Sequence, residues 1–292
     1  MDQKSVSIII PNRNSKTIDK TISSLFNQTA FDNIKEILVI GTDEPGLVFE
    51  RGPVRFLPSQ IPISAPVARN IGIQQVRGTD FVFIDADCIA EPMWLATLLN
   101  AKTAEHQIIG GSVSFEGNNF WQLCYNLTMF HEFIPTAPAG YRKNLGTLNL
   151  LVSRKVVDCT GLLDENLVRC QDTEWTLRMR HHGYTLYFDP NAVVKHLPQV
   201  TGLPQILKLW CLTGFYSSQV RQKYPKLIDP TPFYNSPIIA VLLSPAIGAF
   251  VTTRIFIRNP RLFRYIHTSP VVFLTKIAWI LGTRHHSPGS IK

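Results

Sequence analysis

Two carboxylates one residue apart follow a continuous apolar segment in the first third of the chain. Phe81–Ile84 is wholly apolar, and Asp85-Ala86-Asp87 comes directly after it. Such a run predicts a strand buried on both faces, and ligands bind at the carboxyl edge of a parallel sheet. Because side chains alternate along a strand, we expect Asp85 and Asp87 to point to the same side. Two carboxylates there can hold Mg²⁺ or Mn²⁺, which would neutralise a diphosphate.

A third carboxylate, Asp172, lies at the start of a predicted helix that ends at Gly183. An aspartate in this position is usually a helix cap. The helix N-terminus also tends to keep a carboxylate ionised, which is the state that a general base requires. From the residues alone, a cap and a base both remain open for Asp172.

Strands and helices alternate across the segment that would position these carboxylates. The predicted strands are 5–10, 36–40, 54–57, 81–84, 107–113, 148–152, 184–188 and 192–195, and the predicted helices are 15–28, 66–76, 93–104, one starting near 154–157, and 173–182. Pro11 is expected to end the first strand because it has no N–H group. The alternation predicts an α/β fold with a mostly parallel central sheet flanked by helices. Residues 114–143 are aromatic and irregular, and we expect an acceptor-binding loop there.

Positive charge is concentrated in the last third of the chain. The chain has 292 residues and a net charge of +8, but residues 1–200 hold 18 Lys+Arg against 20 Asp+Glu. Residues 201–292 hold 11 Lys+Arg and one acid, Asp229. Because this basic segment flanks apolar runs and has no nucleic-acid motif, it favours an anionic membrane surface as partner and no nucleic acid.

Two apolar runs near the C-terminus support this expectation. Residues 230–253 carry no charge, and residues 270–282 are broken only by Lys276. The first run is long enough to span a bilayer, but its prolines leave open a re-entrant or interfacial hairpin, or a pair of core helices. Four arginines lie between the runs, at Arg254, Arg258, Arg261 and Arg264, and favour the membrane.

The cysteines and the N-terminus predict the compartment. Five cysteines are widely spaced without a CxxC pair, so neither a disulfide framework nor a zinc site is indicated. Met-Asp-Gln-Lys runs directly into the first strand, without a secretory leader. We therefore expect a reducing cytoplasm and, with the basic segment, the cytoplasmic face of a membrane.

The carboxylate pair belongs to a series of short motifs over residues 5–225. They are Ser7-Ile8-Ile9-Ile10-Pro11-Asn12-Arg13-Asn14, Ala68-Arg69-Asn70-Ile71-Gly72, Asp85-Ala86-Asp87, Gly146-Thr147-Leu148-Asn149, Gly161-Leu162-Leu163-Asp164-Glu165, and Gln171-Asp172-Thr173-Glu174-Trp175 with Arg178. In this order they resemble glycosyltransferase family 2 proteins of the membrane-associated bacterial type, which have the GT-A fold. The resemblance implies an inverting, metal-dependent transferase of the hexosyltransferase type, with a nucleotide-sugar donor and Mn²⁺ or Mg²⁺.

The resemblance also implies roles for individual residues. Asp172 would be the catalytic base, and Asp87 and His196 would bind the metal. The nucleotide-binding residues would be Pro11, Arg13, Asn14, Asp43, Arg69 and Asp85, and the acceptor-binding residues would be Asn149, Gln171 and Trp175. Uridine is the family's default base, and members of this type use lipid-linked or polysaccharide acceptors in envelope or exopolysaccharide synthesis.

Two departures from the family pattern leave alternatives open. Gln171 stands where the family usually has Glu, and Gly41 follows the second strand where the family has an acid, so that Asp43 would substitute after a register shift. A non-catalytic membrane assembly subunit is therefore a rival. A nucleotidyltransferase is another, although Pro11-Asn12-Arg13-Asn14 is not a Gly-rich phosphate loop.

The expected domain organisation follows the same division of the chain. Residues 1–225 would form the GT-A domain, with a nucleotide-binding half over about 1–110 and an acceptor half over about 111–225. Residues 226–292 would form an apolar, basic helical appendage that associates with the membrane, whether peripheral, re-entrant or spanning.

Overall fold

The computed structural model describes residues 6–227 and 237–284. The chain forms two compact units: the first contains Met1–Ser114 and Phe133–Leu197, and the second contains Phe115–Glu132 and Pro198–Lys292. Residues 115–132 and 198–225 therefore belong with the C-terminal helices, whereas the sequence prediction placed them in the transferase domain. Part of the predicted apolar run, residues 230–236, lies outside the described residues.

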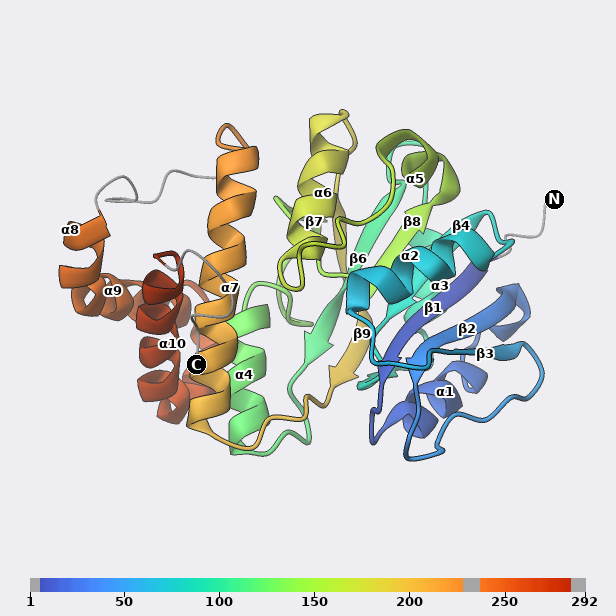
Figure 1. Cartoon of the computed structure of the whole chain (residues 1–292), viewed down its shortest axis with the longest axis horizontal. Coiled ribbons are helices and arrows are strands. Elements are labelled where there is room, and N and C mark those ends of the chain that lie inside the picture. The colour runs from blue at the N-terminus through green and yellow to red at the C-terminus, as the bar shows by residue number, and fades with distance from the viewer. Residues whose placement is uncertain (1–5, 228–236, 285–292) are drawn as a thin grey trace. The chain divides into compact units, whose positions relative to one another are not determined.

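The first unit is built on one mixed sheet, shown in Figure 1. Its strands, in spatial order, are β3 (Val54–Pro58), β2 (Ile34–Thr42), β1 (Val6–Arg13), β4 (Asp80–Ile84), β8 (Asn149–Ser153), β6 (Ile108–Ser114), β9 (Tyr187–His196) and β5 (Cys88–Ala90), with β7 (Gly140–Tyr141) paired to β9. Strands β3, β2, β1 and β4 are parallel, as the alternation of elements predicts. Beyond β4, antiparallel pairs join β8 to β4 and β6, and β5 to β9, while β6 and β9 are parallel.

Two strands pass through prolines, and the first of these, Pro11, was expected to end its strand. β1 continues past Pro11 to Arg13, and it pairs with β4 only over Val6–Ile9, so Pro11 needs no N–H partner on the β4 side. β9 includes Pro190, beside a register shift between Gly111 and Ser112 of β6. The two short strands predicted over 184–195 are thus one long strand, which ends at His196.

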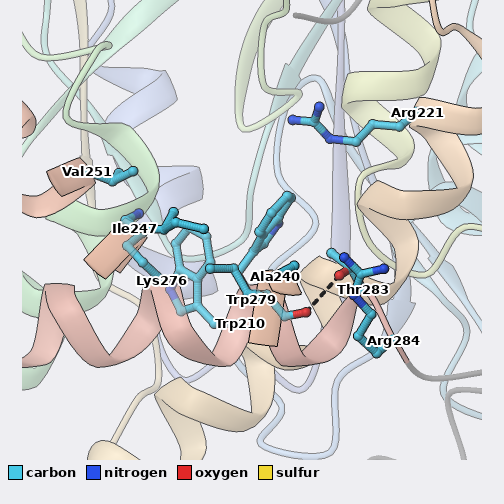
Figure 2. Close-up of a pocket in the computed structure, with 10 residues that line it drawn as sticks. Trp210, Arg221, Ala240, Ile247, Val251, Lys276, Trp279, Thr283 and Arg284 are labelled. Carbon is cyan, nitrogen blue, oxygen red and sulfur yellow. Dashed lines mark hydrogen bonds between the residues drawn. The ribbon is translucent and has the colours of Figure 1, made fainter. Parts of the chain in front are cut away.

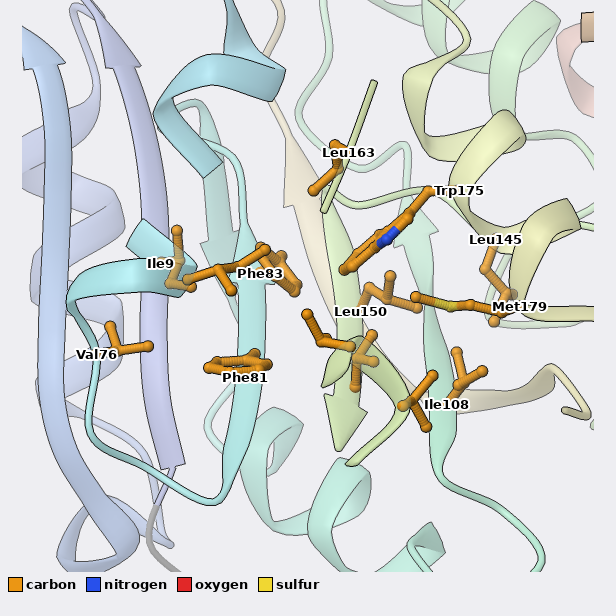
Figure 3. Packing of buried hydrophobic residues seen from close by; sticks show 14 of the residues in the cluster. Ile9, Val76, Phe81, Phe83, Ile108, Leu145, Leu150, Leu163, Trp175 and Met179 are labelled. Atoms are coloured by element: carbon orange, nitrogen blue, oxygen red, sulfur yellow. The ribbon is translucent and has the colours of Figure 1, made fainter. Parts of the chain in front are cut away.

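The main core lies between one face of the sheet and three helices of the first unit. The helical elements of this unit are α1 (Ile18–Phe26), η1 (Phe31–Asn33), α2 (Ala65–Gln75), α3 (Trp94–Ala101), α5 (Arg154–Thr160) and α6 (Gln171–His181). Figure 3 shows the packing of Ile9, Phe81 and Phe83 from the sheet with Val76 and Trp175. The rings of Phe83 and Trp175 meet edge to face, with centroids 5.6 Å apart. The apolar segment before Asp85 is therefore packed into the core and buried along its length.

The second unit is helical. Its elements are α4 (Phe120–Phe130), α7 (Leu203–Lys223), α8 (Pro237–Leu242), α9 (Ser244–Arg258), η2 (Pro260–Thr268) and α10 (Ser269–Gly282). Helix α4 lies in the segment predicted as an irregular loop, and Asn119 and Gln122 start it with reciprocal capping hydrogen bonds. Among the described residues, no helix has the length and apolar character needed to cross a membrane.

Helices α7 and α10 approach each other at backbone distance. A Cβ atom on Gly214 would lie 2.0 Å from the carbonyl oxygen of Trp279, and one on Gly282 would lie 1.9 Å from that of Cys211. Only glycine fits at either position without moving a helix. This contact fixes the relative position of α7 and α10 within the second unit.

Candidate active site

Asp87 and His196 form an ion pair at the ends of two strands. β5 and β9 are antiparallel with Cys88 opposite His196, and this register places Nε2 of His196 3.4 Å from Oδ1 of Asp87. Burial raises the pKa of Asp87, but the charge and hydrogen bond of His196 outweigh it and lower the pKa overall. Burial lowers the pKa of His196, and Asp87 reverses this effect and raises it. Each side chain therefore stabilises the charged form of the other.

The same two side chains have the geometry of a metal-binding pair. The ligand atoms of Asp87, Cys88 and His196 all lie within 4.8 Å of one another. A carboxylate and an imidazole are both suitable ligands for a divalent transition metal such as Mn²⁺. Burial, with the charges of Asp87 and Asp85, raises the pKa of Cys88 well above its usual value, so this thiol is a poor ligand at neutral pH. Asp87 and His196 therefore fit the predicted metal-binding role, without Cys88.

Asp85 has a different partner from Asp87. Nη2 of Arg69, from α2, lies 2.6 Å from Oδ1 of Asp85. The expectation that strand alternation aims both carboxylates to one side does not apply, because β4 ends at Ile84 and a turn closes by a hydrogen bond from Cys88 N–H to Asp85 O. The two aspartates thus take part in two separate ion pairs, one with Arg69 and one with His196.

The Arg69 guanidinium is buried and only partly satisfied. Its side chain is 2% exposed, and neither Nε nor Nη1 has a hydrogen-bond partner among the described residues. Buried donors are nearly always satisfied in native proteins, by protein groups or by bound molecules. Arg69 therefore combines a fixed positive charge with two donors that a ligand or water molecule could satisfy.

Asp172 lies in the first turn of α6, where Cys170 starts the helix with a left-handed backbone (φ 60°). Its Oδ1 accepts a hydrogen bond of 2.8 Å from the N–H of Thr173. Burial raises the pKa of Asp172, and this effect exceeds the lowering by the Thr173 N–H and by the charge of Arg69. A Cβ atom on Gly146 would lie 3.5 Å from Oδ2 of Asp172, so the glycine leaves space beside the carboxylate. Both Arg69 and Asp85 act electrostatically on Asp172.

The predicted nucleotide-binding turn is organised by Asn12, a residue that the sequence interpretation did not select. Its side chain donates to Thr42 O (2.9 Å) and accepts from Ser15 N–H (3.1 Å). Asn14 adopts a left-handed backbone (φ 56°), and its Oδ1 accepts from Glu44 N–H. The two hydrogen bonds of its side chain show that Asn12 organises this turn. Because these bonds form only in the folded chain, the sequence alone could not reveal them.

The remaining predicted nucleotide residues surround this turn. Pro11 pairs in register with Ile40 and is half-buried, and Arg13 is exposed at the end of β1. Oδ2 of Asp43 accepts a hydrogen bond from Val48 N–H, while its buried Oδ1 has no partner within the part of the chain that the structure describes. Gly41 is required by the fold, because a Cβ atom there would lie 1.9 Å from Asn12 O and its φ is +132°. The glycine that replaces the family's acid at position 41 thus has a structural reason. Asp43 is a nearby acid with one oxygen that could accept a hydrogen bond from a ligand.

Two predicted acceptor-binding residues are core residues instead. Asn149 is 1% exposed, and its side chain bonds Trp94 Nε1, Ser112 O and Ala192 O. Trp175 is fully buried, and its indole N–H donates to Gly161 O. Both side chains are thus enclosed and bonded within the protein, which their motif positions did not reveal. Gln171 differs, since its buried Oε1 has no hydrogen-bond partner among residues 6–227 and 237–284.

Asn70 and Glu165, to which the sequence interpretation gave no role, join α2 to the loop before α6. Nδ2 of Asn70 donates to Leu163 O and to Oε1 of Glu165, and its Oδ1 accepts from Leu163 N–H. Arg178, on α6, donates to Thr160 O and Leu162 O. These bonds hold the loop that leads into Asp172 against the helix that carries Arg69.

Three features define the GT-A class of α/β folds. They are the parallel strands that carry the turn at Asn12, the carboxylate pair after β4, and the mixed second half of the sheet. The sequence model of the family "Glycosyl transferase family 2" matches residues 7–159, so the chain belongs to this family. The motifs thus predicted both fold and family correctly.

Known proteins similar to this chain include the following two. Glycosyltransferase AglE of Haloferax volcanii is 27% identical over 201 residues, which cover 65% of this chain and 66% of that protein. A crystal structure of GalNAc-T7 with UDP, GalNAc and Mn²⁺ matches with a TM-score of 0.55 and 16% identity, over 76% of this chain and 51% of the other. The match spans just under two thirds of the first relative and about half of the second. The structural likeness shows the fold.

Proposed function

We propose that the chain is an inverting glycosyltransferase that moves a sugar from a nucleotide-sugar, UDP-linked by default, to a lipid-linked or polysaccharide acceptor in envelope or exopolysaccharide synthesis. The observation that carries the proposal is the placement of Asp172 within the electrostatic reach of Arg69 and Asp85, in a unit that also pairs Asp87 with His196. Family membership supports it, as do the name of the AglE protein and the UDP and Mn²⁺ in the GalNAc-T7 structure.

Asp172 is the general base in this proposal. Displacement of a nucleoside diphosphate from an anomeric carbon requires removal of the proton from the acceptor hydroxyl. Burial raises the pKa of Asp172, and a carboxylate with a raised pKa is a stronger base. The bond to Thr173 N–H fixes one oxygen, and Gly146 leaves space at the other. Attack opposite the leaving group inverts the anomeric configuration.

The leaving group needs compensation for its negative charge. A divalent cation held by Asp87 and His196 would neutralise the diphosphate. Arg69 holds Asp85 in place and keeps a buried positive charge near Asp172, which favours the ionised form of that base. Asp43, through its unpartnered Oδ1, and the turn at Pro11, Arg13 and Asn14 are proposed to bind the nucleoside.

We also propose that the second unit associates with an anionic membrane surface on the cytoplasmic side. Large apolar side chains are exposed on α8, α9 and η2, and arginines are exposed on α9 and η2. The apolar ones are Ile238, Leu242, Phe250, Ile257, Phe263 and Ile266, and the basic ones are Arg254, Arg258, Arg261 and Arg264. Apolar side chains beside basic ones are typical of segments that lie in a membrane interface.

A donor screen tests the catalytic proposal. Purified full-length protein is incubated with UDP-, GDP- and dTDP-sugars and Mn²⁺ or Mg²⁺, and thermal shift and nucleotide release are measured. We expect stabilisation and slow release with one donor, both lost with EDTA and in Asp87→Ala. A folded protein that responds to no nucleotide would contradict the proposal and favour the non-catalytic assembly subunit.

A further inference from the structure

A cavity of about 260 Å³ lies among the helices of the second unit. Its walls come from α7, α8, α9 and α10 and from the residues directly after α10, as Figure 2 shows. Two indole rings, Trp210 and Trp279, line it together with aliphatic side chains of α9. None of these residues is among those predicted to bind the nucleotide, the metal or the acceptor, or to act as the base.

The charged groups of this cavity are all positive. Of the ten described residues that line it, Arg221, Lys276 and Arg284 are cationic and none is acidic. Nζ of Lys276 lies 4.4 Å from the ring centroid of Trp210, and the guanidinium carbon of Arg221 lies 5.5 Å from that of Trp279. Trp210 is itself fixed, because its Nε1 donates to Thr128 Oγ1 (3.1 Å). The cavity thus combines aromatic and aliphatic walls with three cations.

Lys276 shows that this environment disfavours an uncompensated cation. Burial lowers its pKa to about 8, and only part of that effect is opposed by the charge of Glu132. A lysine that served packing alone would be replaced by methionine without loss, since burying a charge is unfavourable unless an opposite charge is present. An anion in the cavity would supply that charge.

The walls of the cavity are also preformed. The glycines Gly214 and Gly282 let α7 and α10 pack at backbone distance, and this contact places Trp210 and Arg221 of α7 beside Lys276 and Trp279 of α10. A rigid site binds with less loss of conformational freedom than one that must be ordered by the ligand.

We propose that this cavity binds the phosphate group of a lipid, with the first carbons of its chain against Trp210 and Trp279. The volume is slightly below the ~300–1,000 Å³ of typical small-ligand sites, which suits a head group and the start of a chain but not a whole lipid. This inference rests on the proposed function, in which the acceptor is lipid-linked, and it assigns the phosphate to the lipid carrier of that acceptor.

Calorimetric titration of the purified full-length protein with farnesyl phosphate, below its micelle concentration, tests the proposal. Farnesol and inorganic phosphate are titrated in parallel, because each offers half of the ligand. We expect farnesyl phosphate to bind at least tenfold more tightly than either. Equal binding of farnesol would overturn the proposal, because the cations would then contribute nothing.

A matched pair of lysine variants locates the site. Lys276→Met is expected to weaken farnesyl phosphate binding roughly tenfold, the effect of losing one charge-assisted hydrogen bond. Its melting temperature should not fall, because methionine is better suited than lysine to a buried position. Lys208→Met removes an exposed lysine from α7, outside the cavity, and should bind as the wild type does. Unchanged binding in Lys276→Met would overturn the proposal.

Two further measurements distinguish the possible sources of the phosphate, and distinguish failure of this proposal from failure of the proposed function. Competition by dihexanoyl phosphatidylglycerol as strong as by farnesyl phosphate would overturn the assignment to the acceptor's lipid carrier. Binding of farnesyl phosphate should persist in Asp172→Asn and in a protein that shows no nucleotide release. A failed donor screen with lysine-dependent lipid binding would therefore contradict the proposed function alone.

Discussion

Nε2 of His196 lies 3.4 Å from Oδ1 of Asp87, although the two residues are far apart in the sequence. The register of β5 against β9 brings them together, and a hydrogen bond from Leu197 N–H to Asp87 O (2.8 Å) continues that pairing past the strand end. The backbone, rather than the side chains, therefore sets the distance between these two groups. Such a preset pair is suited to share one metal ion.

His196→Gln is expected to weaken Mn²⁺ binding by at least ~10–100-fold, because it replaces an imidazole nitrogen by an amide. Titration with Mn²⁺, followed by electron paramagnetic resonance, measures the affinity. The control is His181→Gln, which changes an exposed histidine near the end of α6. Wild-type affinity in His196→Gln would remove His196 from the metal site.

Gly41→Ala is expected to lower stability far more than Gly46→Ala. Both residues have positive φ, but a Cβ atom on Gly41 would lie 1.9 Å from Asn12 O, whereas nothing lies within 4 Å of one on Gly46. We expect a loss of ~1 kcal/mol for Gly46→Ala and more than ~3 kcal/mol for Gly41→Ala. Thermal unfolding measures both. Equal melting temperatures would mean that β2 does not pass Asn12 as closely as the structure shows.

Arg69→Met should shift the pH profile of kcat/KM. A base must be ionised, so activity is lost as the pH falls through the pKa of Asp172. Burial already raises that pKa, and the charge of Arg69 opposes the rise. Removing this charge should move the acid limb to higher pH. The control Arg77→Met changes an exposed arginine and should leave the limb in place. If the acid limb of Arg69→Met lies at the same pH as that of the wild type, the charge of Arg69 does not act on Asp172.

Reversing the charges of Arg261 and Arg264 together to Glu is expected to weaken binding to vesicles containing phosphatidylserine at least tenfold, since each basic side chain near such a surface contributes ~1 kcal/mol. Vesicle sedimentation at several salt concentrations measures the effect. The control reverses Lys16 and Lys20, which are exposed in the first unit. Equal losses in both variants would show that net charge alone, and not the second unit, governs membrane binding.

The sequence predicted the elements whose signal is local. β1, β2 and β4 are continuous apolar runs, and the structure shows them as parallel neighbours. The sequence did not predict that β9 is one continuous strand, because its passage through Pro190 depends on the register shift in its neighbour β6. Nor did it predict that residues 115–132 join the C-terminal helices, since that grouping arises only from tertiary packing.

The site shows the same division between local and tertiary information. The motifs selected Asp87, Asp172 and Arg69 by type and order. They did not show that Asp85 pairs with Arg69 while Asp87 pairs with His196, because those partners depend on a turn after Ile84 and on strand register. The motif position of Trp175 did not reveal its burial, and its ring packs on Phe83 inside the core.

The most direct test of the account is single-turnover transfer by Asp172→Asn, with the donor found in the screen. Asparagine keeps the shape of the side chain but cannot accept the proton, so we expect donor binding close to that of the wild type and transfer slower by about 10²–10⁴-fold. The control Asp164→Asn, in the loop before α6, should transfer at the wild-type rate. Transfer by Asp172→Asn at the wild-type rate would contradict the assignment of Asp172 as the base and, with it, the proposed mechanism.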